Sequence, residues 1–326
     1  MTALTSEQKK ENRSLALRRL IRSYAIWLVL ALLFAIAAML SEAFLRPIYI
    51  FNIVRQAAPV GIAAIGVTLV MILGGVDLSV GAVISLTAVL TAVVMDGKVV
   101  NIPLALAAAL AAGTLTGVVN GVLIAYNRIS PFILTLGTAV AVTGITQIYS
   151  GGTARGIVSP GFREFFNFRI GDVVPVLALI FFALSLLGIW LQGATRFGRS
   201  LFLIGSNPQT ARLSGLPVAR VTILAYAISG FMGGIAGVAL LARSGVSSTF
   251  AGRGLEFDVL AAVILGGTTF QGGRGGIAGT IGAVFVLLLA FNLVNIVGLN
   301  YNAQMIIKGG IIIAASAAYA YLRETR

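Results

Sequence analysis

Apolar residues run through this chain in long stretches, and polar residues gather in the short segments between them. A helix rises about 1.5 Å per residue, so about 20 mostly apolar residues cross a hydrocarbon core of about 30 Å. By this measure about ten membrane-crossing helices are predicted, the eighth short enough to be re-entrant or half-spanning. They cover residues 24–41, 57–74, 80–95, 103–126, 131–149, 173–192, 220–242, 256–270, 276–297 and 302–322.

The composition supports lipid as the solvent for this chain. Its 326 residues are 58% hydrophobic and 10% charged, whereas soluble domains carry about 25% charged residues. No water-soluble fold hides so much apolar surface. The predicted fold class is therefore an all-α polytopic membrane protein. One transmembrane domain over 24–322 lies between a basic segment, 1–23, and a short end, 323–326.

Basic residues indicate the orientation, because Lys and Arg accumulate on the cytoplasmic side. Residues 1–23 carry a basic cluster, so with ten spans both termini are expected in the cytoplasm. Loop 150–172 then lies outside and loop 193–219 inside. A cleaved signal peptide is the alternative for the first span, but its leader and apolar stretch are longer than usual, which favours an anchor. The net charge of +13 is ascribed to orientation and to membrane lipid rather than to nucleic acid.

Several kinds of chemistry lack their residues here. The chain has no cysteine and no histidine, which excludes disulfides, thiol catalysis, imidazole chemistry and the usual zinc sites, so no metal site is expected. A phosphate-binding loop needs G-x-x-x-x-G-K-[S/T], and the Gly97-Lys98 pair has Ala92 in the first glycine position. Most acids map to loops or span ends, which gives no clear proton relay. Any transport would therefore take its energy from another subunit.

Polar residues inside the spans are candidates for a transport path. Asp77 follows Gly74 and Gly75 and precedes a helix expected near Val80. Either its carboxylate or the Ser79 hydroxyl caps that helix by accepting its first free N–H groups, or this segment lines a path. Polar side chains in apolar helices similarly either join two helices or face a solute. The path candidates are Asp77, Ser79, Asn120, Thr135 and Gln147.

Glycines recur at helical spacing in three predicted spans. Gly113, Gly117 and Gly121 form one such ladder. Small residues let membrane helices approach closely, so the ladders predict tight crossings, with a flexible gate as the alternative. The sequence Ile72-Leu73-Gly74-Gly75 recurs from Ile264 to Gly267. This is either a sign of an internal repeat, which is common in transporters, or chance in a chain rich in these residues.

Two kinds of loop could bind other proteins. In loop 193–219, Asn207 is a good N-cap and Pro208 a good first helical residue, and Gly215 ends the segment. A helix of about two turns is predicted, serving as a connector or as a docking element for a motor. The outer loops carry mixed charge, which either solvates them or suits a polar protein partner. The docking candidates are Arg155, Arg163, Glu164, Arg253, Glu256 and Asp258.

Three stretches carry a resemblance to a known family. They are residues 63–81, residues 204–215, and the segment from Gly254-Leu255-Glu256-Phe257-Asp258 through Gly266-Gly267-Thr268 to Gly272-Gly273-Arg274-Gly275. Over about residues 45–320 the chain resembles the permease subunits of ATP-binding-cassette (ABC) importers for ribose, xylose, arabinose, galactosides and related compounds such as autoinducer-2.

This resemblance implies a type II ABC importer-like permease bundle of ten helices and a dimer of permeases. It also implies a separate ATPase, which binds ATP and Mg, and a periplasmic sugar-binding protein. The helix near 207–215 would be the coupling helix, and the ATPase would act on the bundle through Gly205, Asn207, Pro208, Arg212 and Gly215. The solute would pass between two permeases by alternating access. The family usually has Gly-Gly-Asn where this chain has Gly205-Ser206-Asn207, a conservative change.

Two rival functions are weighed against this one. A secondary transporter driven by an ion gradient would work without an ATPase and needs a buried acidic site. A membrane-embedded enzyme needs facing nucleophiles, bases or metal ligands, and the scattered acids without histidine or cysteine argue against it. The sequence therefore predicts a permease without cofactors of its own.

Overall fold

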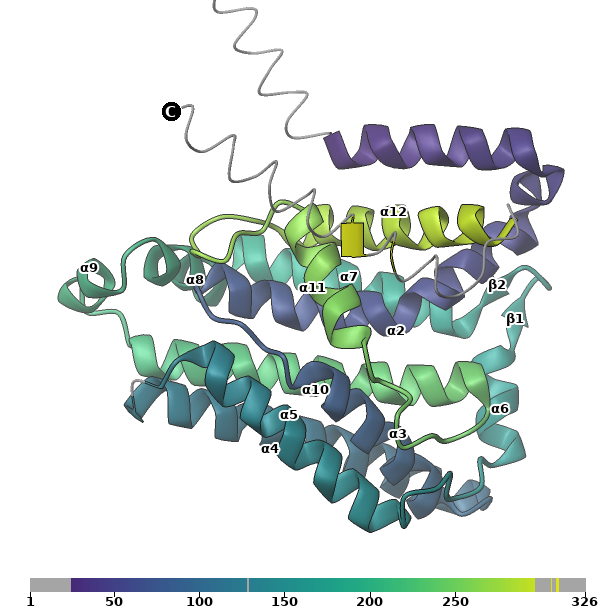
Figure 1. Cartoon of the computed structure of the whole chain (residues 1–326), viewed down its shortest axis with the longest axis horizontal. Coiled ribbons are helices and arrows are strands. Elements are labelled where there is room, and N and C mark those ends of the chain that lie inside the picture. Colours follow the sequence, from purple (N-terminus) through teal and green to yellow (C-terminus); the bar gives the residue numbers. More distant parts are fainter. Residues whose placement is uncertain (1–24, 128, 297–305, 307–308, 311–326) are drawn as a thin grey trace, which may run out of the picture.

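The computed structural model describes residues 25–127, 129–296, 306, 309 and 310. Within these residues the chain is helical apart from one short β-hairpin and the connecting turns (Figure 1). A helix over Ala25–Leu40 comes first. The later elements are η1 Glu42–Leu45, α2 Pro47–Ile72, α3 Val80–Met95, η2 Val99–Asn101, α4 Ile102–Asn127, α5 Pro131–Ser150, α6 Pro160–Asn167, β1 Arg169–Ile170, β2 Val174–Pro175, α7 Val176–Ala194, α8 Arg196–Ser206, α9 Pro208–Leu213, α10 Val218–Ser244, α11 Leu255–Leu265 and α12 Ile277–Ile296.

Six of the described helices are long and apolar enough to cross a membrane: α2, α4, α5, α7, α10 and α12. The helix Ala25–Leu40 and α3 are shorter, and α11 has only 11 residues. Each of the first nine predicted segments contains one of these helices, and segment 302–322 lies outside the described residues. The all-α polytopic class is confirmed, whereas the number of spans stays a prediction.

Some predicted boundaries are wrong. Helix α2 begins at Pro47, well before the predicted start at 57, because Pro47 suits a first helical position and apolar residues follow it. The predicted outer loop holds α6 and strand β1. The strands pair antiparallel, Arg169 with Pro175 and Ile170 with Val174. The predicted inner loop holds α8 as well as α9.

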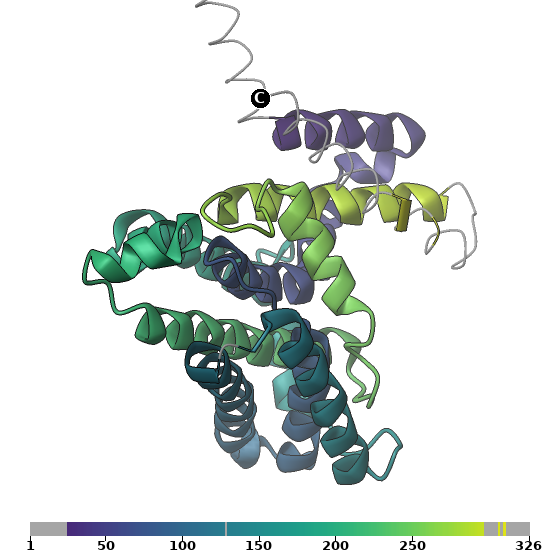
Figure 2. The ribbon, with the colours of Figure 1, turned by 60° about the vertical axis from the view of Figure 1, so that its left-hand side comes forward.

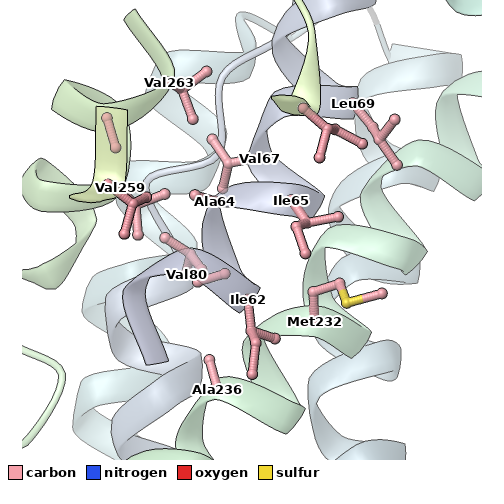
Figure 3. Packing of buried hydrophobic residues seen from close by; sticks show 14 of the residues in the cluster. Ile62, Ala64, Ile65, Val67, Leu69, Val80, Met232, Ala236, Val259 and Val263 are labelled. Atoms are coloured by element: carbon pink, nitrogen blue, oxygen red, sulfur yellow. The ribbon is translucent and has the colours of Figure 1, made fainter. Parts of the chain in front are cut away.

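Helices α2 and α10 form the centre of the bundle. In the most apolar window of α2, 83% of residues are buried, against 17% in α5, so α2 is covered by protein and α5 lies at the edge. The buried cluster brings together side chains from α2, α3, α10 and α11, as Figure 3 shows for Ile62, Ile65, Val80, Met232, Ala236, Val259 and Val263. These four elements therefore share one packed core.

Helices α4 and α10 cross with their backbones almost in contact. Gly113 lies against Gly230 and Gly234, and Gly117 lies against the backbone of Tyr226. A Cβ at Gly117 would overlap the Tyr226 carbonyl oxygen. The glycine ladder predicted on this span is therefore a packing surface.

Two helices end in the same way, each on a left-handed glycine. After α2, Gly74 has φ +89° and the Gly75 N–H donates to the Val70 carbonyl at 2.9 Å. After α11, Gly267 has φ +93° and the Thr268 N–H donates to the Val263 carbonyl at 3.1 Å. This is the Schellman pattern, which needs a residue without a Cβ in the left-handed position. The repeated Ile-Leu-Gly-Gly sequence therefore marks two equivalent helix ends, although the left-handed glycine is the first of its pair after α2 and the second after α11.

Helix α3 begins deep inside the bundle. The segment 73–79 returns from the end of α2 without helical structure, and α3 then runs beside α10, with Val80 and Val83 next to Gly233. Gly233 is 15 residues into the 27-residue α10, about 22 Å along a helix of about 40 Å. The predicted span 80–95 is thus a helix that starts at mid-depth. Below, the bundle end that carries α9 is called the α9 end, and the opposite one, with β1 and β2, the hairpin end (Figure 1).

Candidate functional site

A cavity of about 700 Å³ lies where α3, α5 and α11 meet. Figures 1 and 2 show α11 running obliquely between α12 and the helices α3 and α5. The cavity has the size of a typical small-molecule site and the usual mixture of apolar walls with a few polar groups. Its polar lining residues are Ser85, Thr143, Gln147, Thr249, Arg253 and Glu256, and its aromatic ones are Phe132, Phe250, Phe257 and Phe270.

Two breaks in helical structure form part of the cavity wall. Val76 and Leu78 come from the segment between α2 and α3, and Arg253 comes from the turn before α11. Both α3 and α11 therefore begin at the cavity. Non-helical backbone at this depth is tolerated where it lines a cavity or is buried in protein. The N-termini of two helices, whose first N–H groups have no partner within the helix, consequently lie close to the cavity.

The two breaks pack directly on each other through glycines. Gly81 lies against the backbone of Gly252 and the Glu256 carboxylate, which leaves no space for a Cβ. The Gly252 N–H donates to Ser85 Oγ at 2.8 Å, and the Gly254 N–H donates to Glu256 Oε2 at 3.0 Å. The first turn of α3 and the turn before α11 therefore form one continuous surface.

A buried polar network lies behind this wall. Asp77 Oδ1 accepts from the Ser79 N–H at 3.0 Å and from the Ser79 hydroxyl at 2.5 Å, and Oδ2 accepts from Ser229 on α10 at 2.7 Å. Asn120 on α4 donates to Ser79 Oγ at 3.0 Å and accepts from Thr138 on α5 at 2.7 Å. The segment that forms the wall is thus tied to three helices.

Backbone groups of the same segment find partners on its neighbours. The Leu78 N–H donates to Thr135 Oγ1 at 3.1 Å, and the Tyr226 hydroxyl donates to the Val76 carbonyl at 3.1 Å. A chain that is neither helix nor strand needs such partners when it is buried. The polar side chains of α5 and α10 thus make the break in the helix possible.

Sequence reasoning found the members of this network but not their arrangement. Asp77, Ser79, Asn120 and Thr135 are all at most 1% exposed and lie outside the cavity lining, whereas Gln147 lines the cavity. The predicted cap was wrong: Ser79 occupies the N-cap position of α3 without a side-chain cap bond, and Asp77 bonds to Ser79 instead. The two side chains satisfy each other and α10, so they fix the segment rather than cap α3.

The docking candidates divide into two groups. Arg155 and Arg163 are exposed at the hairpin end, as is Glu164. The Arg155 guanidinium donates to the Tyr149 carbonyl at 3.1 Å, and the Arg163 guanidinium lies beside Gly245. Arg253 and Glu256 line the cavity instead, and Arg253 lies 6.0 Å from the centre of the Phe250 ring. Asp258 is in the first turn of α11.

The predicted helix near 207–215 is present as α9. Asn207 caps it by accepting from the Thr210 N–H at 3.0 Å, and Pro208 is its first residue. Gly215 has φ +79° with nothing within 4 Å of an added Cβ, and the Arg212 side chain is exposed. Helix α9 therefore projects from the bundle as an exposed element (Figure 1).

Helix α8, which sequence reasoning missed, connects α9 to the bundle. Thr195 caps it by accepting from the Gly198 N–H at 3.1 Å, a signal that was readable in the sequence. At its other end, Gly205 lies against the Ile72 carbonyl and the Gly273 N–H. The Gly273 N–H donates to the Ile72 carbonyl at 2.8 Å, and Gly272 lies next to Gly74. These four residues, Gly74, Gly205, Gly272 and Gly273, are called the glycine junction below.

Taken together, the features define a class of protein. Apolar helices, two breaks in helical structure around a partly polar cavity, and an exposed helix joined through α8 to the segments that follow α2 and α11 are typical of a membrane transport protein. Among the described residues no group of three or more acidic, histidine or cysteine side chains could hold a metal ion.

Comparison with known proteins identifies the family. Residues 49–316 match the family described as "Branched-chain amino acid transport system / permease component", and the chain belongs to this family. It is 37% identical to the ribose import permease protein of Escherichia coli (strain K12) over 294 residues, which is 88% of this chain and 90% of that one.

Other relatives are similarly close. Identity is 34% to the ribose import permease protein of Bacillus subtilis (strain 168), with 95% of this chain and 97% of that one covered. It is 33% to the galactose/methyl galactoside import permease protein of Haemophilus influenzae, with 91% and 94% covered. No solved structure matches the chain. The resemblance to sugar importer permeases is confirmed, and the protein is a membrane-embedded permease of the ABC importer type.

Proposed function

We propose that this chain is the permease subunit through which an ABC importer carries a monosaccharide or a related small polar solute across a bacterial inner membrane. The relatives named for ribose and galactoside import support a sugar over a branched-chain amino acid, although the family description names the latter. The observation that carries the proposal is the cavity between the two broken helices, because it combines aromatic faces with several neutral hydrogen-bonding groups.

The cavity is the solute path in this proposal. Gln147 and Thr143 on α5 and Ser85 on α3 offer donors and acceptors to hydroxyl groups. Phe250 and Phe257 offer aromatic faces to the C–H groups of a sugar ring. Arg253 and Glu256, predicted to dock a protein, are reassigned to the path because they line the cavity. The network of Asp77, Ser79, Asn120 and Thr135 holds the wall in place.

Energy comes from a partner ATPase, which binds ATP and Mg. We assign its contact to α9, with Asn207, Pro208, Arg212 and Gly215 at the interface and Gly205 passing the movement to the bundle. The α9 end is then cytoplasmic, as are both termini, and the bundle has about ten spans. A periplasmic sugar-binding protein docks at the hairpin end near Arg155, Arg163 and Glu164. A second permease copy, identical or related, completes the path, and membrane lipid covers the rest.

Reconstitution in proteoliposomes tests the proposal. The permease is combined with its candidate ATPase and binding protein, and uptake of labelled ribose, galactose and leucine is measured with and without ATP. Sugar uptake that needs ATP and both partners is the expected result. Uptake by this chain alone, driven by a proton or sodium gradient, would instead establish the secondary transporter. ATP-dependent uptake of leucine but not of sugar would refute the substrate class alone.

Two glycine variants test the coupling assignment. Gly215→Arg places a bulky charge on a left-handed residue beside α9, and we expect it to abolish association with the ATPase. Gly151→Arg is the matched control, since Gly151 also has a positive φ, +68°, and open surroundings, but lies at the hairpin end. It should keep ATPase association. Equal loss in both variants would show that backbone strain, rather than the position of α9, is responsible.

A further inference from the structure

Three arginines from separate elements converge at the hairpin end. Arg55 lies on α2, Arg169 on β1 and Arg243 near the end of α10. Each finds a neutral oxygen as acceptor: Asn167 Oδ1 for Arg55 at 2.9 Å, Asn52 Oδ1 for Arg169 at 3.0 Å, and the Gln56 carbonyl for Arg243 at 3.1 Å. The arginine cluster, as these three residues are called here, is thus built into the fold by specific contacts.

Among the described residues, the arginine cluster has no acidic partner for its positive charges. Arg169 acts on Arg55 as a like charge, and Arg55 acts on Arg243 in the same way. Among the described residues the ion pair is between Lys98 and Asp96, at 3.7 Å, and no carboxylate pairs with the cluster. Two guanidinium atoms, Arg55 Nε and Arg169 Nη1, are buried without a hydrogen-bond partner.

Such an arrangement destabilises an isolated subunit. An unsatisfied buried donor lowers the stability of the fold, more so when it is charged, and the neighbouring like charges add to this. Unsatisfied donors and unpaired charges of this kind are expected where a ligand or partner supplies the acceptors and the opposite charge. Arginine guanidinium groups match carboxylates in charge and in their forked geometry.

The position of the cluster favours a soluble partner over a lipid. Arg243 lies near the end of α10 and Arg55 is nine residues into α2. The most apolar windows of these two helices are 67% and 83% buried, so the helices are central rather than at the lipid boundary. Asn52 and Asn167 surround it with further polar groups. A ligand therefore approaches along the bundle axis from the aqueous side. Three arginines also suit a surface with more than one carboxylate better than a single small anion.

We propose that the arginine cluster of Arg55, Arg169 and Arg243 is the receptor for surface carboxylates of the solute-binding protein that docks on the permease. This inference rests on the proposed function, which supplies such a partner at the hairpin end. It places the strongest charge contact beside α2 and the end of α10, away from Arg155 in the outer loop. Sequence reasoning missed the cluster because its members are far apart in the chain and only Arg169 lies in the long outer loop.

The test measures binding of the purified binding protein that supports uptake by the wild-type permease. The permease–ATPase complex is placed in nanodiscs of phosphatidylcholine alone. We expect Arg55→Gln and Arg169→Gln each to weaken binding about tenfold or more, as loss of one partner of a close charge pair does. Added salt should weaken wild-type binding and affect the double variant less. Lys98→Gln is the matched control, because Lys98 has its own acidic partner, and it should bind normally.

Thermal unfolding separates a docking role from a structural one. Neutralising Arg169 removes a like charge beside Arg55 and a guanidinium nitrogen, Nη1, that is buried without a hydrogen-bond partner. The melting temperature of Arg169→Gln should therefore stay the same or rise while its binding falls. A fall in both would mark the cluster as structural and overturn the proposal. If these variants do not fold, Arg243→Gln decides the question, because that side chain is exposed.

The remaining outcomes are also decisive. Normal binding by the arginine variants beside normal wild-type binding overturns this site and leaves the proposed function intact. Failure of the wild type to bind any solute-binding protein counts against the proposed function. A defect that appears only in nanodiscs containing phosphatidylglycerol assigns the cluster to anionic lipid and overturns the docking proposal.

Discussion

Replacing Gly205 with alanine tests whether the glycine junction connects α8 to the rest of the bundle. An ideal Cβ at this position would lie 2.5 Å from the Gly273 nitrogen and closer still to the Ile72 carbonyl oxygen. Both are backbone atoms and cannot rotate away. Carbon atoms pack best at about 3.5–4.0 Å from their neighbours, so α8 must move by roughly 1 Å.

The size of the effect follows from this overlap. Overpacking of a tight interface typically costs about 1–3 kcal/mol. Since each kcal/mol lowers the melting temperature of a domain of 150–250 residues by about 2–4 °C, we expect a decrease of about 2–12 °C in detergent. The junction also joins α8 to the segments that follow α2 and α11. Gly205→Ala should therefore lower the amount of solute imported per ATP hydrolysed.

The matched control is Gly193→Ala in α7. An added Cβ there meets nothing within 4 Å, and alanine is favoured over glycine inside a helix by roughly 0.5–1 kcal/mol. Its stability and coupling should equal or exceed those of the wild type. If Gly205→Ala melts and transports like Gly193→Ala, the backbone contact at the junction does not exist as described and the reasoning fails.

Two other predictions concern the bundle and the cavity. Gly117→Ala should lower the free energy of unfolding by about 1–3 kcal/mol because its Cβ would overlap the Tyr226 carbonyl. The control Gly137→Ala, in open space on α5, should leave the free energy of unfolding unchanged. Equal melting temperatures in the two variants would contradict the crossing of α4 and α10. Gln147→Ala should raise the KM of uptake without changing the melting temperature, since Gln147 lines the cavity. Ser229→Ala should instead lower the melting temperature through loss of its bond to Asp77. An unchanged KM in Gln147→Ala would remove this residue from the path.

Hydropathy predicted the helices well because lipid imposes a length and a composition on each span. It could not show where α2 begins, since Arg55 interrupts the apolar run. It also missed α8, whose mixed polar and apolar residues resemble a loop, although Thr195 marks its start. Spans are therefore readable from composition, whereas amphipathic surface helices need their caps to be recognised.

The site was harder to predict because charged residues were expected to face water. Arg253 precedes the predicted span 256–270 and Glu256 begins it, so both were assigned to an outer loop. The chain instead turns back into the bundle after Gly245 and carries both residues to the cavity. The aromatic residues gave no signal in a chain with 18 phenylalanines. Which face of a helix meets a cavity depends on tertiary packing, which one sequence does not encode visibly.

The glycines explain how a movement at α9 could reach a cavity near mid-depth. Helix α8 touches the end of α2 and residues 272–273 at the glycine junction, and from there two separate segments lead to the cavity, one through Asp77 to α3 and one back along α11. Contacts between backbones without side chains cannot be absorbed by rotamer changes, and close-packed interiors transmit strain. Gly81 and Gly252 join the two segments again at the cavity. A displacement of α8 therefore acts on both walls together, which is what alternating access by an external motor requires.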